Sequence, residues 1–157
     1  MKLAAIDIGS NAVRLQITNT IEYQNVVTFK KLEYIRFPLR LGFDVFTNGR
    51  ISEYNKERFL KLMNAYKMMI DLYEVDQFYA CATSAMRESE NGLQILDRVR
   101  AEWGLDIEII NGDEEARLIN EAVKLSTSYP KYLHVDVGGG STELNYYING
   151  EIISSRS

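Results

Sequence analysis

The stretch AAIDIGSNAVRLQI, from Ala4 to Ile17, places Asp7 at the end of an apolar run and follows it with Gly-Ser-Asn. Residues 2–8 form the apolar run, and residues 12–18 alternate apolar and polar side chains, which is typical of a strand with one buried face. We therefore expect a strand, a tight turn and a second strand. A carboxylate at the end of a buried strand is costly without a partner, so Asp7 is expected to meet a ligand or to cap the turn.

A second stretch, LHVDVGGGSTELNY from Leu133 to Tyr146, repeats the first. Its Asp136-Val137-Gly138 matches Asp7-Ile8-Gly9, and in both stretches a charged residue follows the first glycine by the same interval. The sequence thus predicts the same strand–turn–strand unit near each end of the chain.

The composition of these turns suits a phosphate ligand. Glycines let the backbone approach a ligand closely, and successive N–H groups can form a concave site for an anion. An aspartate at the strand end is a suitable ligand for a hard divalent cation. Two tight hairpins without any ligand are the alternative interpretation, but the same acid at the same offset in both turns favours phosphate with Mg²⁺.

The remaining pattern predicts an α/β fold with a mixed sheet, in which an antiparallel meander is followed by helix-linked parallel strands. The helices are expected at residues 52–73, 90–103 and 112–125, and further strands at residues 22–35, 77–82, 105–110, 132–137 and 142–148. Residues 37–50 are expected to form loop and turn, because Gly42 and Asn48-Gly49 lie in this segment.

Composition narrows the class of protein. The chain has 157 residues, enough for one ordinary domain, and a formal net charge of -4, which argues against nonspecific nucleic-acid binding. Cys81 is the single cysteine, so no internal disulfide can form, and we expect it to be a buried, inert thiol. The sequence shows no signal peptide and no membrane-spanning run. We therefore expect a cytoplasmic protein with no membrane partner and no nucleic-acid partner.

The segments AIDIGSNAVRL, ATSAMRE, NGDEEARLI and DVGGGSTEL resemble, in this order, the motifs of the exopolyphosphatase / guanosine pentaphosphate phosphohydrolase family. That family belongs to the sugar kinase / heat-shock ATPase / actin superfamily, whose lobes have ribonuclease-H-like topology. The resemblance implies Mg²⁺ or another divalent cation as cofactor. It also implies polyphosphate or guanosine pentaphosphate as substrate.

The resemblance assigns a role to each matching residue. Glu115 resembles the base that activates water, Arg87 the arginine that reaches the phosphates, and Asp136 with Glu143 the acidic pair that holds the metal. The phosphate-binding positions implied by the resemblance are Asp7, Gly9, Ser10, Asn11, Arg14, Gly138, Gly139, Gly140 and Ser141.

Several of these residues have a plainer explanation. Glu115 follows Asp113 and Glu114 in the first turn of a predicted helix, where acids complement the helix dipole. Arg14 can pair with a carboxylate instead of phosphate, and Arg87 can form a surface salt bridge. His134 is expected to be structural, because a metal cluster would need a second histidine.

Family members continue beyond the second turn, so the resemblance implies a first lobe at residues 1–128 and the first strands of a truncated second lobe at 129–157. Strand edges exposed in this way invite pairing, and we expect a homodimer. The expected activity is removal of a terminal phosphate, weak or absent in these 157 residues alone. The alternatives are a nucleotide-binding kinase or ATPase of the same superfamily, or a phosphate-binding fragment without catalysis.

Overall fold

The computed structural model describes residues 1–24, 26–126, 129–138 and 142–156. The chain divides into two compact units, Met1–Ile110 and Asn111–Ser157, and each is considered by itself. The expected lobe boundary after residue 128 stays a prediction. In the structure, the helix that precedes this position belongs to the second compact unit.

The first unit contains a five-stranded mixed sheet in the order β3-β2-β1-β4-β5. Its strands are β1 (Lys2–Ile8), β2 (Val13–Tyr23), β3 (Val26–Phe37), β4 (Gln77–Ala82) and β5 (Glu108–Ile109). The first three form an antiparallel meander, β4 pairs parallel to β1, and β5 pairs parallel to β4. The expected α/β architecture is therefore present, although β5 is shorter than the predicted strand at residues 105–110.

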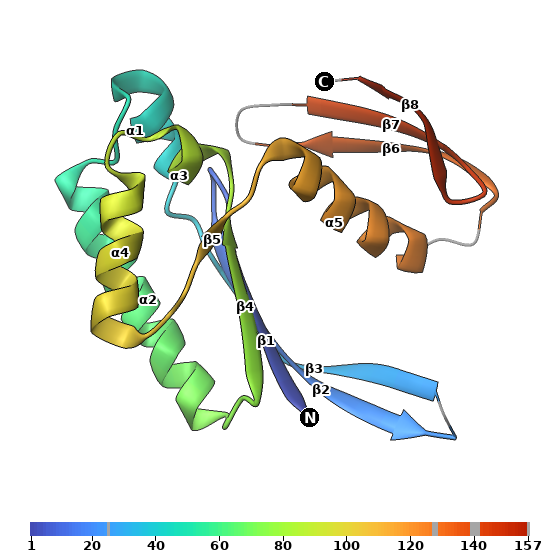
Figure 1. The fold of residues 1–157 in the computed structure, drawn as a ribbon, viewed down its shortest axis with the longest axis horizontal. Coiled ribbons are helices and arrows are strands. Elements are labelled where there is room, and N and C mark those ends of the chain that lie inside the picture. The colour runs from blue at the N-terminus through green and yellow to red at the C-terminus, as the bar shows by residue number, and fades with distance from the viewer. Residues whose placement is uncertain (25, 127–128, 139–141, 157) are drawn as a thin grey trace. The chain divides into compact units, whose positions relative to one another are not determined.

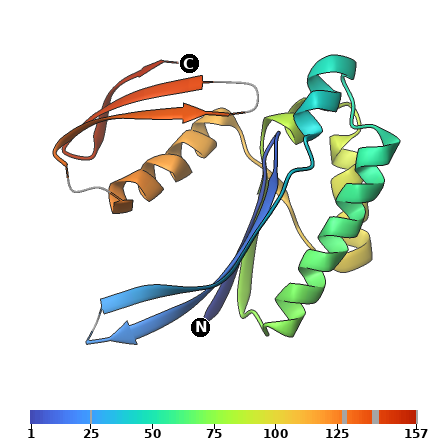
Figure 2. The same cartoon turned by 180° about the vertical axis from the view of Figure 1, so that it is seen from behind.

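Two long helices, α2 (Glu53–Leu72) and α4 (Gly92–Trp103), pack side by side on one face of this sheet (Figures 1 and 2). The apolar stripe predicted for this helix faces the core, because Phe59, Met63, Tyr66 and Ile70 of α2 are buried. Ser52 caps α2 as predicted, since its side chain accepts a hydrogen bond from the N–H of Asn55 at 3.3 Å. The core thus lies between the helices and one face of the sheet.

The prediction of loop and turn for residues 37–50 is wrong, because α1 (Leu41–Asn48) occupies most of this segment. The helix buries Leu41 and Val45, and Asp44 fastens it to the start of α2. Asp44 Oδ2 accepts hydrogen bonds from the N–H of Ser52 at 2.9 Å, from the Ser52 hydroxyl at 2.5 Å and from the Asn55 amide at 2.9 Å. Tertiary contacts thus outweigh the weak helix propensity of the sequence.

A short helix, α3 (Ser84–Glu88), directly follows β4. The sequence indicated a strand-to-helix junction here but not the extent of the helix. A buried asparagine then fastens the start of α4, because Asn91 Oδ1 accepts the N–H of Ile51 at 2.9 Å and Asn91 Nδ2 donates to the Ile51 carbonyl at 2.9 Å. The side chain thereby satisfies both polar backbone groups of a buried residue.

The second unit contains α5 (Gly112–Ser126) and an antiparallel sheet of β6 (Lys131–Val137), β7 (Thr142–Ile148) and β8 (Glu151–Arg156). The predicted helix and strands are confirmed within a residue at each end. Asn149 and Gly150 form the predicted hairpin turn, with φ angles of 53° and 80°. Tyr132 and Tyr147 stack across β6 and β7 with ring centroids 4.6 Å apart.

Candidate active site

The parallel strands of the first unit bring several sequence motifs to one edge of the sheet. Ile8 pairs with Ala82 and Ala82 pairs with Ile109, so β1, β4 and β5 end side by side. The loops that follow these strands begin at Gly9, Thr83 and Ile110. Ligands of α/β sheets bind at the carboxyl ends of parallel strands, so this edge is the candidate phosphate site of the first unit.

Hydrogen bonds fix the turn between β1 and β2. The N–H of Gly9 donates to the Ala12 carbonyl at 3.1 Å and closes the turn. The Ser10 carbonyl accepts the N–H of Gly42 at 2.8 Å, and the Asn11 carbonyl accepts the N–H of Arg40 at 2.9 Å. Both carbonyl oxygens are therefore occupied. Within residues 1–24 and 26–126, no acceptor is found for the N–H groups of Ser10 and Asn11, which makes these groups suitable donors to an anion.

The loop after β4 contacts this turn directly. The hydroxyls of Ser10 and Ser84 lie 2.8 Å apart, and the N–H of Thr83 donates to the Ile8 carbonyl at 3.1 Å. The sequence did not predict Ser84 as a site residue. Its place in ATSAMRE, just after a predicted strand, could have indicated this role, but its contact with Ser10 depends on the parallel pairing of β1 with β4.

Asp7 forms an ion pair with Arg14, whose Nη1 lies 2.5 Å from Asp7 Oδ2. The two residues are directly opposite each other in β1 and β2. Of the two alternatives for Arg14, phosphate or a carboxylate, the structure shows the carboxylate contact, and the acid at the strand end has a partner within its own hairpin. A phosphate contact of either residue stays a prediction.

Arg87 lies at the same edge, in α3. Its Nη1 donates to the Ile110 carbonyl at 2.8 Å, and its Nη2 lies 3.7 Å from Glu88 Oε1. The surface salt bridge expected as the plainer explanation is thus present but long. A guanidinium carries five N–H donors, so the bond to Ile110 fixes its position and leaves capacity for an anion.

The thiol of Cys81 differs from the prediction of a buried side chain. Cys81 is half-buried, because it lies opposite Asp7 on β4 and Ala82 rather than Cys81 faces the core. Side chains of neighbouring residues in a strand point to opposite faces of the sheet, so Cys81 points away from the core when Ala80 and Ala82 face it.

The second turn has the same register as the first. Asp136 pairs with Glu143 and Val137 with Thr142, as Asp7 pairs with Arg14 and Ile8 with Val13. The predicted repeat of the strand–turn–strand unit is therefore confirmed for the paired strands. Asp136 is half-buried and Gly138 is exposed, whereas the predicted phosphate positions Gly139, Gly140 and Ser141 and the side chain of Glu143 lie outside the described residues.

Glu115 lies in the first turn of α5. The N–H of Glu115 donates to the Asn111 carbonyl at 3.0 Å, and the Asn111 side chain accepts the N–H of Glu114 at 2.9 Å, which caps the helix. The Glu114 carboxylate accepts two hydrogen bonds from Arg117, at 2.8 and 2.7 Å, and these bonds hold the pKa of Glu114 below its ordinary value. Both acids are half-buried, and the bonds to Arg117 give Glu114 a structural role.

The metal prediction rests on donor chemistry. Asp136 and Glu143 are adjacent on paired strands, and Mg²⁺ is commonly bound through one or two carboxylates with water completing its shell. The residues present fit such an ion. Among the described residues, no group of three or more Asp, Glu, His or Cys side chains is placed to hold a metal ion. The side chain of Glu143 is not among those described.

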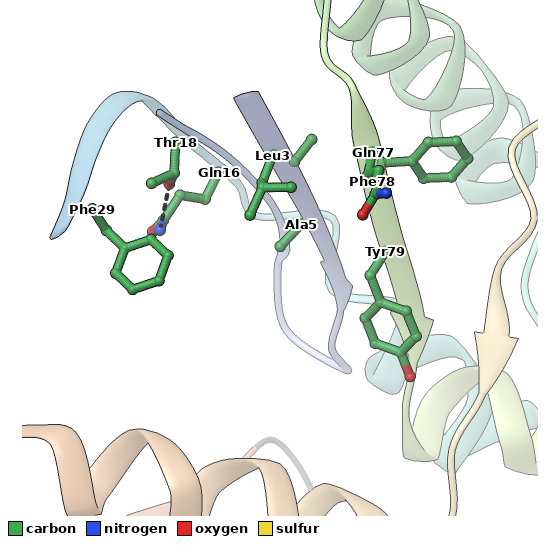
Figure 3. Close-up of a pocket in the computed structure, with 9 residues that line it drawn as sticks. Leu3, Ala5, Gln16, Thr18, Phe29, Gln77, Phe78 and Tyr79 are labelled. Carbon is green, nitrogen blue, oxygen red and sulfur yellow. Dashed lines mark hydrogen bonds between the residues drawn. The ribbon is translucent and has the colours of Figure 1, made fainter. Parts of the chain in front are cut away.

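A shallow hollow of about 340 Å³ lies on the sheet of the first unit (Figure 3). Its lining is apolar or uncharged and consists of Leu3, Ala4, Ala5, Gln16, Thr18, Phe29, Gln77, Phe78 and Tyr79. No charged side chain among the described residues lines it, so it does not suit a phosphate. The candidate site is the loop edge instead of this hollow.

The Ppx/GppA phosphatase family model matches residues 20–157 of the chain. The chain belongs to the Ppx/GppA phosphatase family. It is 36% identical over 146 residues to a bifunctional 3-dehydroquinate synthase/phosphatase of Fusobacterium nucleatum, covering 89% of this chain and 22% of that protein. It is 28% identical over 153 residues to exopolyphosphatase 1 of Mycobacterium tuberculosis, covering 96% of this chain and 44% of that protein. The chain thus spans less than half the length of these curated relatives.

Solved structures of family members support the fold. The Aquifex aeolicus Ppx/GppA phosphatase is 32% identical with a TM-score of 0.82, over 99% of this chain and 51% of that one. An exopolyphosphatase from Cytophaga hutchinsonii is 29% identical with a TM-score of 0.86, over 99% of this chain and 49% of that one. The fold class predicted from the sequence, a ribonuclease-H-like lobe of the actin-like ATPase superfamily, is confirmed. In the described residues, no helix has the length and apolar character needed to cross a membrane.

Proposed function

We propose that the full-length protein hydrolyses phosphoanhydride bonds and removes the terminal phosphate of inorganic polyphosphate, the 5′ phosphate of guanosine pentaphosphate, or both. The observation that carries this proposal is the repeated strand–turn–strand unit with its acid at the same register position, in a chain of the Ppx/GppA phosphatase family. The similarity to exopolyphosphatase 1 supports polyphosphate as the substrate class.

In this proposal the first turn binds phosphate oxygens. The N–H groups of Ser10 and Asn11 donate to them, while the N–H groups of Gly42 and Arg40 hold the carbonyl groups of the same two residues. Such donors lower the energy of charge that develops during phosphoryl transfer, because they are already oriented before the reaction. Arg87, fixed by its bond to Ile110, adds a positive charge.

Glu115 is proposed as the general base that accepts a proton from the attacking water. It lies in the first turn of α5, where Asn111 caps the helix start, and the adjacent acid Glu114 is the one that accepts two hydrogen bonds from Arg117. Asp136 and Glu143 would hold Mg²⁺ or another divalent cation. When bound, such an ion supplies charge neutralisation to the phosphate oxygens.

Two alternatives remain distinct from this proposal. A kinase or ATPase of the same superfamily would share the paired phosphate turns but would act on ATP. A protein that binds phosphate without catalysis would retain affinity and show no turnover. We also propose that the 157-residue chain alone is weak or inactive and that the protein forms a homodimer.

The test is phosphate release by the full-length protein with Mg²⁺ and, in parallel, polyphosphate, guanosine pentaphosphate or ATP. We expect release from at least one of the first two and slower release from ATP. Turnover of ATP alone would favour the kinase or ATPase class. Tight binding of polyphosphate without release would favour the non-catalytic class.

A further inference from the structure

Two arginines lie directly opposite each other on the sheet, beside the first turn. Arg14 of β2 and Arg36 of β3 are register partners in the antiparallel pair. Side chains in this relationship lie on one face of a sheet with their Cβ atoms about 5 Å apart, and like charges placed there destabilise the sheet. A pair of this kind needs either local compensation or an anionic ligand.

Among the described residues, a nearby acid neutralises the charge of one of the two arginines. Arg14 pairs with Asp7, whereas no acidic partner of Arg36 is found in the part of the chain that the structure describes. The acid nearest along β3, Glu33, lies on the other face of the strand, where it accepts a hydrogen bond from the Tyr73 hydroxyl at 2.6 Å. The row Arg36–Arg14–Asp7 therefore carries one more positive than negative charge.

The position of this row joins it to the candidate site. Arg36 precedes Phe37, the last residue of β3, and Phe37 pairs with Val13, the first residue of β2 after the turn. Arg36 thus lies at the loop edge of the sheet. Since neighbouring strands are about 4.8 Å apart, Arg36 is separated from Asp7 by roughly 10 Å across the sheet. Arg36 is thus at the far end of this row from Asp7, one strand beyond Arg14.

We propose that Arg36 is a substrate-binding residue, which contacts a phosphate group farther along the substrate than the phosphate held by the Ser10–Asn11 turn. The ligand class is a chain of several linked phosphates. This inference rests on the proposed function and deepens it, because it identifies how the site favours an extended polyanion. Planar guanidinium groups are well suited to phosphate oxygens.

A plainer explanation is that Arg36 protects an edge strand, since charged side chains on such strands prevent pairing with other chains. Lys30 offers a control on the other face of the same strand. It is exposed on the same edge strand and pairs with Asn19, away from the loop edge. If charge on the edge strand were the whole role of Arg36, substitution of Lys30 would have the same effect on substrate binding.

The experiment compares Arg36→Ala and Lys30→Ala in the full-length protein, with long polyphosphate, tripolyphosphate and guanosine pentaphosphate as substrates. For Arg36→Ala we expect KM for long polyphosphate to rise about tenfold, the effect of losing one charge-assisted contact, with kcat and the KM for tripolyphosphate little changed. The dependence of log KM on log salt should become shallower by about one. Lys30→Ala should leave these quantities near their wild-type values.

A rise in KM for guanosine pentaphosphate alone would overturn the assignment of this subsite to a long chain of linked phosphates. An unchanged KM for long polyphosphate in an active, folded Arg36→Ala protein would overturn the inference, as would an equal rise in Lys30→Ala. If Arg36→Ala proves unstable by thermal unfolding, Arg36→Gln gives the same comparison, and Arg36→Lys, which keeps the charge, should retain most of the affinity. Absence of phosphate release by the wild-type protein would instead overturn the proposed function.

Discussion

Arg14 and Asp7 form an ion pair of 2.5 Å at the same register position that Glu143 and Asp136 occupy in the second hairpin. The two strand–turn–strand units are therefore built alike but carry different residues opposite the shared acid. A cation stands opposite it in the first unit, which suits an anionic ligand beside the turn. An acid stands opposite it in the second, which suits a divalent cation.

The ion pair is expected to serve binding more than stability. The side chains of Arg14 and Asp7 are 39% and 43% exposed, and exposed pairs contribute about 0–1 kcal/mol. Asp7→Asn should thus change the free energy of unfolding by less than about 1 kcal/mol. It should also raise KM for polyphosphate in the full-length protein, because Arg14 loses the partner that holds it beside the turn.

Urea unfolding and steady-state phosphate release measure these two effects. Asp71→Asn is the control, because Asp71 forms an exposed ion pair with Lys67 on α2. That variant should leave KM unchanged. A loss of stability above about 2 kcal/mol with unchanged KM in Asp7→Asn would show that the Asp7–Arg14 pair is structural.

Asn91→Ala should be among the more destabilising substitutions of the first unit. It removes both hydrogen bonds to the backbone of Ile51 and leaves a buried N–H and carbonyl without partners. We expect a loss of about 2–4 kcal/mol in urea unfolding. The exposed Asn64→Ala on α2 should change stability by about 0.5 kcal/mol or less. Equal effects of the two substitutions would contradict this assignment.

The stability provided by Asp44 should depend on pH. Burial raises the pKa of Asp44, but hydrogen bonds from the hydroxyl and N–H of Ser52 and from Asn55 outweigh it, so the pKa is lowered from 3.8. A carboxyl with a lower pKa in the folded state stabilises the protein above its unfolded pKa, and this contribution is lost as the pH falls through the folded value.

Asp44→Asn should therefore cost about 1–2 kcal/mol at pH 7, and the difference from wild type should shrink below about pH 4. Urea unfolding of both proteins across this range gives the comparison. A difference that stays constant from pH 7 to pH 3 would contradict the role of the charged carboxylate.

Close packing between α1 and the first turn predicts a strong effect at Gly42. A Cβ added there would lie 2.9 Å from Ser10 Cβ and 3.2 Å from the Ser10 carbonyl oxygen. Gly42→Ala should thus displace the turn, cost about 1–3 kcal/mol in thermal or urea unfolding and reduce phosphate release. Gly112→Ala is the matched control for stability, since no atom lies within 4 Å of its added Cβ. Equal stability of the two variants would refute this packing argument.

The sequence allowed good prediction where periodicity dominates. The stripe from Phe59 to Ile70 and the apolar strand 77–82 give a helix and a strand at nearly the predicted positions. Helix α1 was missed because its stability comes from burial of Leu41 and Val45 and from the hydrogen bonds of Asp44, and these contacts exist only in the folded chain.

The sequence predicted the candidate site only in part, because strand patterns can be recognised in a sequence but the contacts between strands cannot. Asp7 stood out as a costly acid at a strand end, but its partner depends on the register of β1 and β2. Alternation along a strand identifies the face of a side chain, not the residue opposite it. The Ser10–Ser84 contact and the Arg14–Arg36 pair follow from strand pairing and were therefore not visible in the sequence.

The central claim is hydrolysis by this site with Glu115 as the base. The most direct measurement is Mg²⁺-dependent phosphate release from polyphosphate by the full-length Glu115→Gln protein, with Glu114→Gln as the control on the adjacent, Arg117-bonded acid. We predict that Glu115→Gln abolishes release while thermal unfolding stays near wild type, and that Glu114→Gln retains turnover. Release at the wild-type rate by a folded Glu115→Gln protein would contradict the claim.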